Sequence, residues 1–239
     1  MDLEAFLRTP PSLHRPGGGE LVQMGLAPEM LAFIAAHVDE SSHTLETGAG
    51  MSTIVFAAKG SRHIAITPVK EEIALITRHC EEHGIATERV TFLCAPSEHA
   101  LPSLQTESLD LVVIDGRHGF PAPFIDFFYT AGKLRIGGHL IVDDVQLSPS
   151  RYMRDLLAEQ PEWQLVKELE HRSAVFEKLG EGSEWLDWAD QPFVMRTSGV
   201  PTPLQVALQD LRRRDLGALA GRVRRTAGRL TAQRGDRSR

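Results

Sequence analysis

An alternation of strand-like and helical segments is the feature that most constrains this fold. Short strand-like runs recur through the middle of the chain, at residues 43–47, 63–67, 90–94, 109–115 and 138–143. Segments with helical spacing of apolar residues lie before or between them, at residues 28–38, 52–59, 69–83, 97–104 and 121–134. Parallel strands need crossover connections, and strands buried on both faces read as continuous apolar runs. The pattern therefore predicts an α/β fold, a parallel sheet with helices on both faces.

Two further strand-like runs, residues 163–169 and 173–178, predict an antiparallel addition at the end of the sheet because so few residues separate them. A content of 42% hydrophobic and 24% charged residues is that of an ordinary globular protein. We expect a flexible N-terminal arm over residues 1–20, one domain over residues 21–198, and a basic helical tail over residues 199–239.

The composition of the C-terminal tail bears on whether it binds a second copy of the chain or nucleic acid. Residues 201–239 hold ten arginines and three aspartates, whereas the whole chain has a net charge of −6. The tail has an apolar side and could mediate a homodimer, but no aromatic residues are interleaved for base stacking, which argues against nucleic acid. No apolar run approaches the roughly 20 residues of a membrane span.

A cytoplasmic location is expected from the cysteines and the first residues. Cys80 and Cys94 are the only cysteines and form no CxxC pair, so no disulfide framework is predicted. Acidic residues precede any basic residue at the N-terminus, which argues against a secretory signal.

The segment Leu45–Thr53 predicts a cofactor site. An acidic residue, Glu46, is followed by Thr47-Gly48-Ala49-Gly50 at the passage from a strand to a helix. Glycines let a ligand lie directly on the backbone, and the helix N-terminus offers N–H groups to it. A dinucleotide fingerprint would need a third glycine where Thr53 stands, and an acid about 20 residues later, so NAD is not indicated.

Three segments in order, Leu45–Thr53, Ile114–Gly116 and Arg135–Asp144, resemble those of class I S-adenosylmethionine-dependent methyltransferases, over about residues 40–180. The resemblance implies a Rossmann-like three-layer sandwich with a mostly parallel seven-stranded sheet whose last strand is antiparallel. It implies S-adenosyl-L-methionine across the carboxyl ends of the strands. It implies these cofactor-binding residues: Glu46, Gly48, Ala49, Gly50, Ser52, Thr53, Thr67, Ser97 and Asp115.

Two positions depart from the family pattern. The second strand ends in Thr67 rather than in the acid that grips the ribose hydroxyls, so Glu71 or Glu72 would have to reach back from the next helix. After the third strand, Ser97 or Glu98 takes the place of the acid near the adenine amine.

Carboxylates gather after two later strands. Asp115 follows one strand and the pair Asp143-Asp144 follows the next, so all three should converge at the carboxyl edge of the sheet. Converging carboxylates repel one another, and protonation or a bound cation relieves the repulsion. Hard oxygen ligands suit Mg²⁺. The set resembles the metal site of catechol-type O-methyltransferases and antibiotic-tailoring enzymes, which makes Asp115, Asp143 and Asp144 the predicted metal ligands and Asp115, His118 and Asp143 the predicted catalytic residues. Without a metal, the acids would order a loop and cap the following segment.

The predicted function is methyl transfer from S-adenosylmethionine to a small-molecule hydroxyl, with Mg²⁺. Two alternatives stay open: a metal-free methyltransferase with His118 as base, acting on oxygen or nitrogen, and a non-catalytic module whose arginine-rich tail docks a partner. Trp185, Trp188 and Phe193 could wall an acceptor pocket or simply pack.

Overall fold

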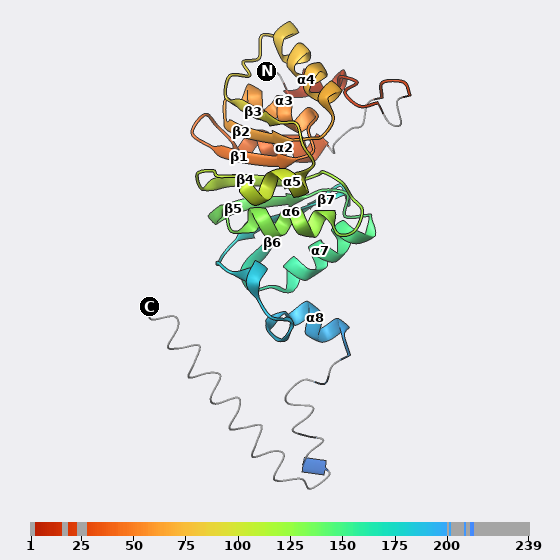
Figure 1. The fold of residues 1–239 in the computed structure, drawn as a ribbon, viewed down its shortest axis with the longest axis vertical. Coiled ribbons are helices and arrows are strands. Elements are labelled where there is room, and N and C mark those ends of the chain that lie inside the picture. The colour runs from red at the N-terminus through yellow and green to blue at the C-terminus, as the bar shows by residue number, and fades with distance from the viewer. Residues whose placement is uncertain are drawn as a thin grey trace. The chain divides into compact units, whose positions relative to one another are not determined.

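A seven-stranded sheet forms the centre of the computed structural model, which describes residues 3–15, 19–22, 28–199, 201, 208, 211 and 212. The strand order is β3-β2-β1-β4-β5-β7-β6 (Figure 1). The strands are β1 (His43–Thr47), β2 (Arg62–Ile66), β3 (Val90–Leu93), β4 (Leu109–Ile114), β5 (Leu134–Val142), β6 (Trp163–Leu169) and β7 (Ser173–Lys178).

The strand directions confirm the predicted fold class. Strands β3, β2, β1, β4 and β5 are parallel, and β7 is antiparallel to both of its neighbours, β5 and β6. The cause is local: only residues 170–172 join β6 to β7, and Glu170 and His171 adopt positive φ values in that turn. Because β6 runs parallel to β5, the β6–β7 turn lies at the same carboxyl edge as the loops after β4 and β5.

Helices cover both faces of the sheet. One face packs against α2 (Pro28–His37), α3 (Met51–Ala58) and α4 (Lys70–Glu82). The other packs against α5 (Ser97–Ala100), η2 (Leu101–Ser103), α6 (Ala122–Ala131) and α7 (Ser148–Glu159). Helix α7 was not among the predicted helices, although Met153 and Leu157 give it a buried side at helical spacing.

Alternation along β4 and β5 fixes where the following residues point. Leu111 and Val113 face the α2–α4 side, and Val112 and Ile114 face the α6–α7 side. In β5, Ile141 faces the first side and Val142 the second. A residue that extends either strand by one position must therefore face the α2–α4 side.

Residues 1–20, expected as a flexible arm, contribute packed structure where they are described. Helix α1 (Leu3–Arg8) places Phe6 in the core, and Leu13 is buried as well, because both side chains are apolar. His14 then forms a β-bridge with Val22. The boundary drawn at residue 20 is therefore not a boundary of packing.

The C-terminal region holds short helices η3 (Ser183–Trp185), η4 (Trp188–Asp190) and α8 (Pro192–Thr197). The chain divides into two compact units, the first comprising residues up to 187 with 191–193 and the second residues 188–190 with those from 194 onward. The predicted tail helix, and with it the predicted dimer contact, falls mainly outside the described residues. Among the described helices, none is long and apolar enough to cross a membrane.

Candidate functional site

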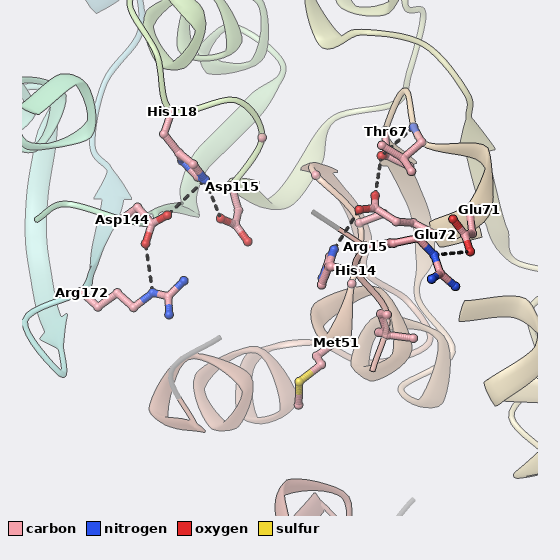
Figure 2. A pocket seen from close by; sticks show the side chains of 16 residues that line it. His14, Arg15, Met51, Thr67, Glu71, Glu72, Asp115, His118, Asp144 and Arg172 are labelled. Carbon is pink, nitrogen blue, oxygen red and sulfur yellow. Dashed lines mark hydrogen bonds and ion pairs between the residues drawn. The ribbon is translucent and has the colours of Figure 1, made fainter. Parts of the chain in front are cut away.

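A cavity of about 510 Å³ lies over the glycine turn at the carboxyl edge of the sheet. Its walls come from the N-terminal segment Leu13–Arg15, the turn Gly48–Met51, the start of α4, and the residues after β4 and β5 (Figure 2). This volume is within the range of small-molecule and cofactor sites.

The turn exposes bare backbone, as predicted. Gly48 has φ +87°, and its N–H donates to the carbonyl of Ile66 at 2.9 Å. A Cβ atom at Gly48 would lie 2.3 Å from the backbone oxygen of Asp115. At Gly50, a Cβ atom would lie 3.2 Å from Nε2 of His14. Both glycines, together with Ala49, line the cavity.

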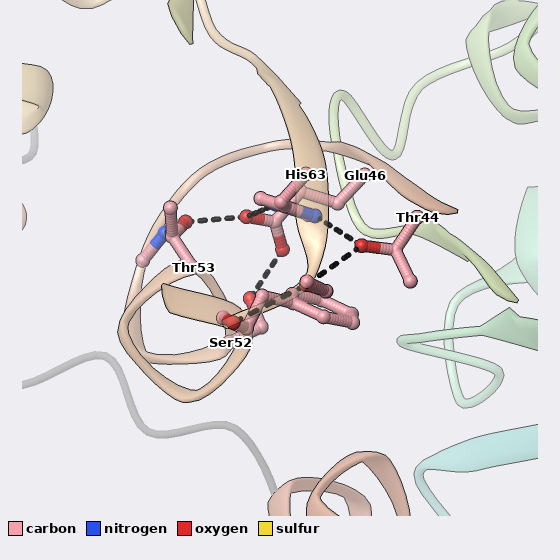
Figure 3. A network of polar contacts seen from close by, with 8 residues as sticks. Thr44, Glu46, Ser52, Thr53 and His63 are labelled. Carbon is pink, nitrogen blue, oxygen red and sulfur yellow. Dashed lines mark hydrogen bonds and ion pairs between the residues drawn. The ribbon is translucent and has the colours of Figure 1, made fainter. Parts of the chain in front are cut away.

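The side chains of Glu46, Ser52 and Thr53 turn away from this cavity. Glu46 is buried and accepts hydrogen bonds from the hydroxyls of Ser52 and Thr53, and its Oε1 lies 3.0 Å from Nε2 of His63 (Figure 3). A buried carboxylate needs such partners. The prediction of hydroxyl groups that bind the cofactor is corrected accordingly: the network shapes the turn, and the backbone is left for a ligand.

An acidic side chain does reach the end of β2. Thr67 donates a hydrogen bond to Oε2 of Glu72 at 2.9 Å, and Oε1 of Glu72 lies 2.8 Å from Nδ1 of His14. Glu71 is paired with Arg15 at 3.1 Å. All five residues line the cavity. The expectation that α4 supplies the missing acid therefore agrees with the geometry, whereas the part played by His14 and Arg15 was missed.

Ser97, at the start of α5, is not among the residues that line the cavity. Its hydroxyl lies near Asp126, which is fully buried on α6. Burial raises the pKa of Asp126, and the hydroxyls of Ser97 and Thr47 offset only part of that rise. Glu98 pairs with Arg117.

The register of β4 and β5 explains the electrostatics of the acidic cluster. Ile114 is opposite Val142, so Asp115 and Asp143 follow at neighbouring positions of adjacent parallel strands. Burial raises the pKa of Asp115 well above its ordinary value, and the negative charges of Asp143 and Asp144 raise it further.

Asp143, predicted as a catalytic residue and metal ligand, lies beside Asp115 but does not line the cavity. Its N–H donates to the carbonyl of Ile114 at 3.0 Å, so it continues the alternation of β5 and faces the α2–α4 side. The side chain is fully buried, where it accepts a hydrogen bond from Ser173 and lies 3.3 Å from Arg172.

Asp144 points into the cavity because its backbone breaks that alternation, with φ 53°. Its Oδ2 lies 3.1 Å from Nε2 of His118 and its Oδ1 lies 3.1 Å from Nε of Arg172 (Figure 2). The same Nε2 of His118 is 4.0 Å from Asp115. One ligand atom from each of Asp115, His118 and Asp144 falls within 4.8 Å of the others.

Sequence reasoning missed Arg172, although a signal was present. The residue lies in the short β6–β7 turn, and two predicted strands joined by three residues return the chain to the carboxyl edge of the sheet. A basic residue there faces the acids that end the parallel strands.

The comparisons with known proteins agree with this fold. Residues 45–145 match the family described as "Methyltransferase domain". No curated protein sequence matches the chain. Among solved structures, the chain is similar to cofactor-bound Rv0187 from MTB, at 19% identity and a TM-score of 0.58, over 75% of this chain and 97% of that one.

Two further structures are O-methyltransferases by description. TomG from Streptomyces achromogenes, in complex with SAM and involved in tomaymycin synthesis, has 17% identity and a TM-score of 0.56, over 67% of this chain and 84% of its own. A proposed O-methyltransferase from Klebsiella pneumoniae has 18% identity and a TM-score of 0.59, over 74% and 90%. Matching structures also include rRNA methylases, so the fold leaves the acceptor open. The family match and the shared fold confirm the resemblance of this chain to the class I S-adenosylmethionine-dependent methyltransferases.

Proposed function

We propose that this protein transfers a methyl group from S-adenosylmethionine to the hydroxyl of a small molecule, with His118 as the base. The observation that carries the proposal is one cavity lined both by the bare Gly48–Gly50 backbone and by the cluster of Asp115, His118 and Asp144. A cofactor on the turn and an acceptor at the cluster would share this space.

The two ends of the cavity suit the two ends of the reaction. At one end, Glu72 offers acceptor oxygens for ribose hydroxyls, in place of the acid that β2 lacks. At the other end, Nε2 of His118 lies 3.1 Å from Oδ2 of Asp144, an arrangement that suits a tautomer with the proton on Nε2 and leaves Nδ1 to accept a proton. The acceptor oxygen forms a bond to the methyl carbon, the carbon–sulfur bond breaks, its electron pair stays on sulfur, and the hydroxyl proton moves to His118.

The partners of Asp144 favour His118 as a base over a metal ion bound at the cluster. One Asp144 oxygen faces Arg172 and the other faces His118, while Asp143 is turned into the interior. A cation at Asp144 would share these oxygens with the positively charged Arg172, and the third nearby group, His118, offers an imidazole, which Mg²⁺ does not prefer.

A Mg²⁺-assisted reaction remains the second candidate, because two carboxylates and His118 bring ligand atoms within 4.8 Å of one another. Asp115 and Asp144 would hold the ion, with waters completing its shell. When bound, such an ion lowers the pKa of the acceptor hydroxyl.

Calorimetric titration with S-adenosylhomocysteine tests the cofactor site first, and methyl transfer from labelled S-adenosylmethionine to a panel of phenols, catechols and amines tests the chemistry. We expect binding without added metal and phenol methylation that survives EDTA. His118→Ala should lower turnover about 10²- to 10⁴-fold while leaving S-adenosylhomocysteine affinity within a fewfold.

His83→Ala is the matched control, since this exposed histidine follows α4 and does not line the cavity. Its turnover should equal that of the wild type. Transfer abolished by EDTA and restored by Mg²⁺ would select the second candidate. The absence of heat at millimolar S-adenosylhomocysteine would reject both and favour a non-catalytic module.

A further inference from the structure

Aromatic side chains gather on the surface beside the catalytic loops. Phe120 is 62% exposed and lies two residues after His118 in the chain. Its ring contacts those of Phe124 and Tyr152, with 6.1 Å between ring centroids in each pair. Tyr152, on α7, is also exposed, as is Leu147, which follows Asp144 by three residues in a turn closed by the 2.9 Å hydrogen bond from Leu147 N–H to Asp144 O.

Phe120 and Leu147 lie just after His118 and Asp144 on the two loops that carry those residues. Each loop continues directly into an exposed apolar side chain, Phe120 in one case and Leu147 in the other. An acceptor whose hydroxyl contacts His118 must extend away from the cofactor end of the cavity. Phe120 is the next exposed apolar residue on the loop of His118, and its ring contacts that of Tyr152; we call these two residues the aromatic platform.

We propose, resting on the proposed methyl-transfer function, that the aromatic platform of Phe120 and Tyr152 binds a planar aromatic acceptor whose phenolic hydroxyl reaches His118. Exposed aromatic rings bury a large area at little cost in side-chain entropy and add a geometric preference for another ring. The platform holds no charged side chain, so it favours the apolar ring of an acceptor over a sugar or a phosphate group.

A second exposed aromatic pair, formed by Phe128 on α6 and Trp185 on η3, provides an internal comparison. Phe128 lies in the second half of α6, and its ring contacts that of Trp185, which is 72% exposed, with 4.8 Å between the ring centroids. Neither pair lines the cavity, but Phe128 and Trp185 lie outside the loops that carry His118 and Asp144. If exposed aromatic area alone determined acceptor binding, the Phe128–Trp185 pair would bind an aromatic acceptor as well as the platform does. If nearness to His118 determines it, only the platform would bind the acceptor.

The test measures binding of 2-naphthol to the full chain with S-adenosylhomocysteine present, by naphthol fluorescence, and compares it with saturated decahydro-2-naphthol by ligand-observed NMR. We expect 2-naphthol to bind at least several times more tightly. Phe120→Ala and Tyr152→Ala should weaken 2-naphthol about three- to tenfold, the range of ring–ring interactions. Phe120→Leu, which keeps apolar volume and loses the ring, should weaken it as well. Trp185→Ala should have no effect.

Equal binding of the two naphthols, unchanged affinity in Phe120→Ala, or an equal loss in Trp185→Ala would each overturn the proposal. These readouts are binding affinities, so they separate from the proposed function. Loss of S-adenosylhomocysteine binding would reject that function, whereas normal cofactor binding with the platform variants unaffected would reject the platform alone.

Discussion

The backbone at Gly48 lies so close to the backbone of Asp115 that a Cβ atom would not fit, and replacing Gly48 tests this contact. Gly48→Ala would need both a positive φ and space where Asp115 O lies only 2.3 Å from the new Cβ. We expect the unfolding free energy to fall by about 2 kcal/mol or more, measured by urea unfolding, together with weakened S-adenosylhomocysteine binding.

Gly84→Ala is the matched control for that change. Gly84 also has a positive φ, +66°, but nothing lies within 4 Å of a Cβ atom there. It should therefore lose only the backbone term, about 1 kcal/mol. Equal losses in the two variants would show that the contact with Asp115 contributes nothing.

Asp126 predicts a pH dependence of stability. Burial raises its folded pKa above the ordinary value of 3.8, so the folded state binds the proton more tightly than the unfolded state. Its contribution to stability is therefore greatest below pH 3.8 and is lost as the pH rises through the folded pKa. Asp126→Asn removes this titration. The unfolding free energy of the variant relative to the wild type should rise from pH 4 toward neutral pH. Urea unfolding at each pH measures this difference.

The exposed Asp187→Asn serves as the comparison for Asp126. Its stability difference from the wild type should stay flat over the same range of pH. A flat difference for Asp126→Asn as well would mean that the buried carboxyl titrates as it does in the unfolded chain.

At the scale of elements, the start of α4 and the N-terminal segment act together on the cofactor end of the cavity. Glu72 connects Thr67 to His14, whereas Glu71 pairs with the more exposed Arg15. We expect Glu72→Gln to weaken S-adenosylhomocysteine binding about tenfold, because hydrogen bonds to charged groups are worth about 1.5–3 kcal/mol. Calorimetry measures the loss.

Glu71→Gln, the adjacent acid on the same cavity wall, should change the affinity by less than about twofold, since its carboxylate is about half exposed. The reverse order of effects would place the ribose beside Glu71 instead. A null result for both would move the ribose away from α4 altogether.

The elements themselves were largely predictable. Strands β1, β6 and β7 agree with their predicted ranges. What could not be read was the direction of single side chains after a strand. Asp143 and Asp144 are adjacent, and only the positive φ of Asp144 decides that one faces the interior and the other the cavity.

At the scale of the whole molecule, the site draws on segments far apart in the chain. His14, Gly48, Glu72, Asp144 and Arg172 meet only because the sheet order brings their elements to one edge. The parallel part of that order followed from the alternation of strands and helices. The contributions of His14 and Arg172 did not, because they depend on how a terminal segment and an antiparallel turn pack against the parallel core.

Both sides of the sheet complete their described cores before the C-terminal region begins, which predicts the effect of removing the C-terminus. The described buried apolar residues end at Phe176, on β7. A chain ending at Phe193 should therefore keep its thermal midpoint within a few degrees and its S-adenosylhomocysteine affinity within about twofold. A chain ending at Arg172 removes β7, whose Val175 and Phe176 belong to opposite cores, and should show no cooperative unfolding. If the chain ending at Phe193 also loses its cooperative transition in calorimetry, the basic tail supports the fold and the domain ends later than residue 193.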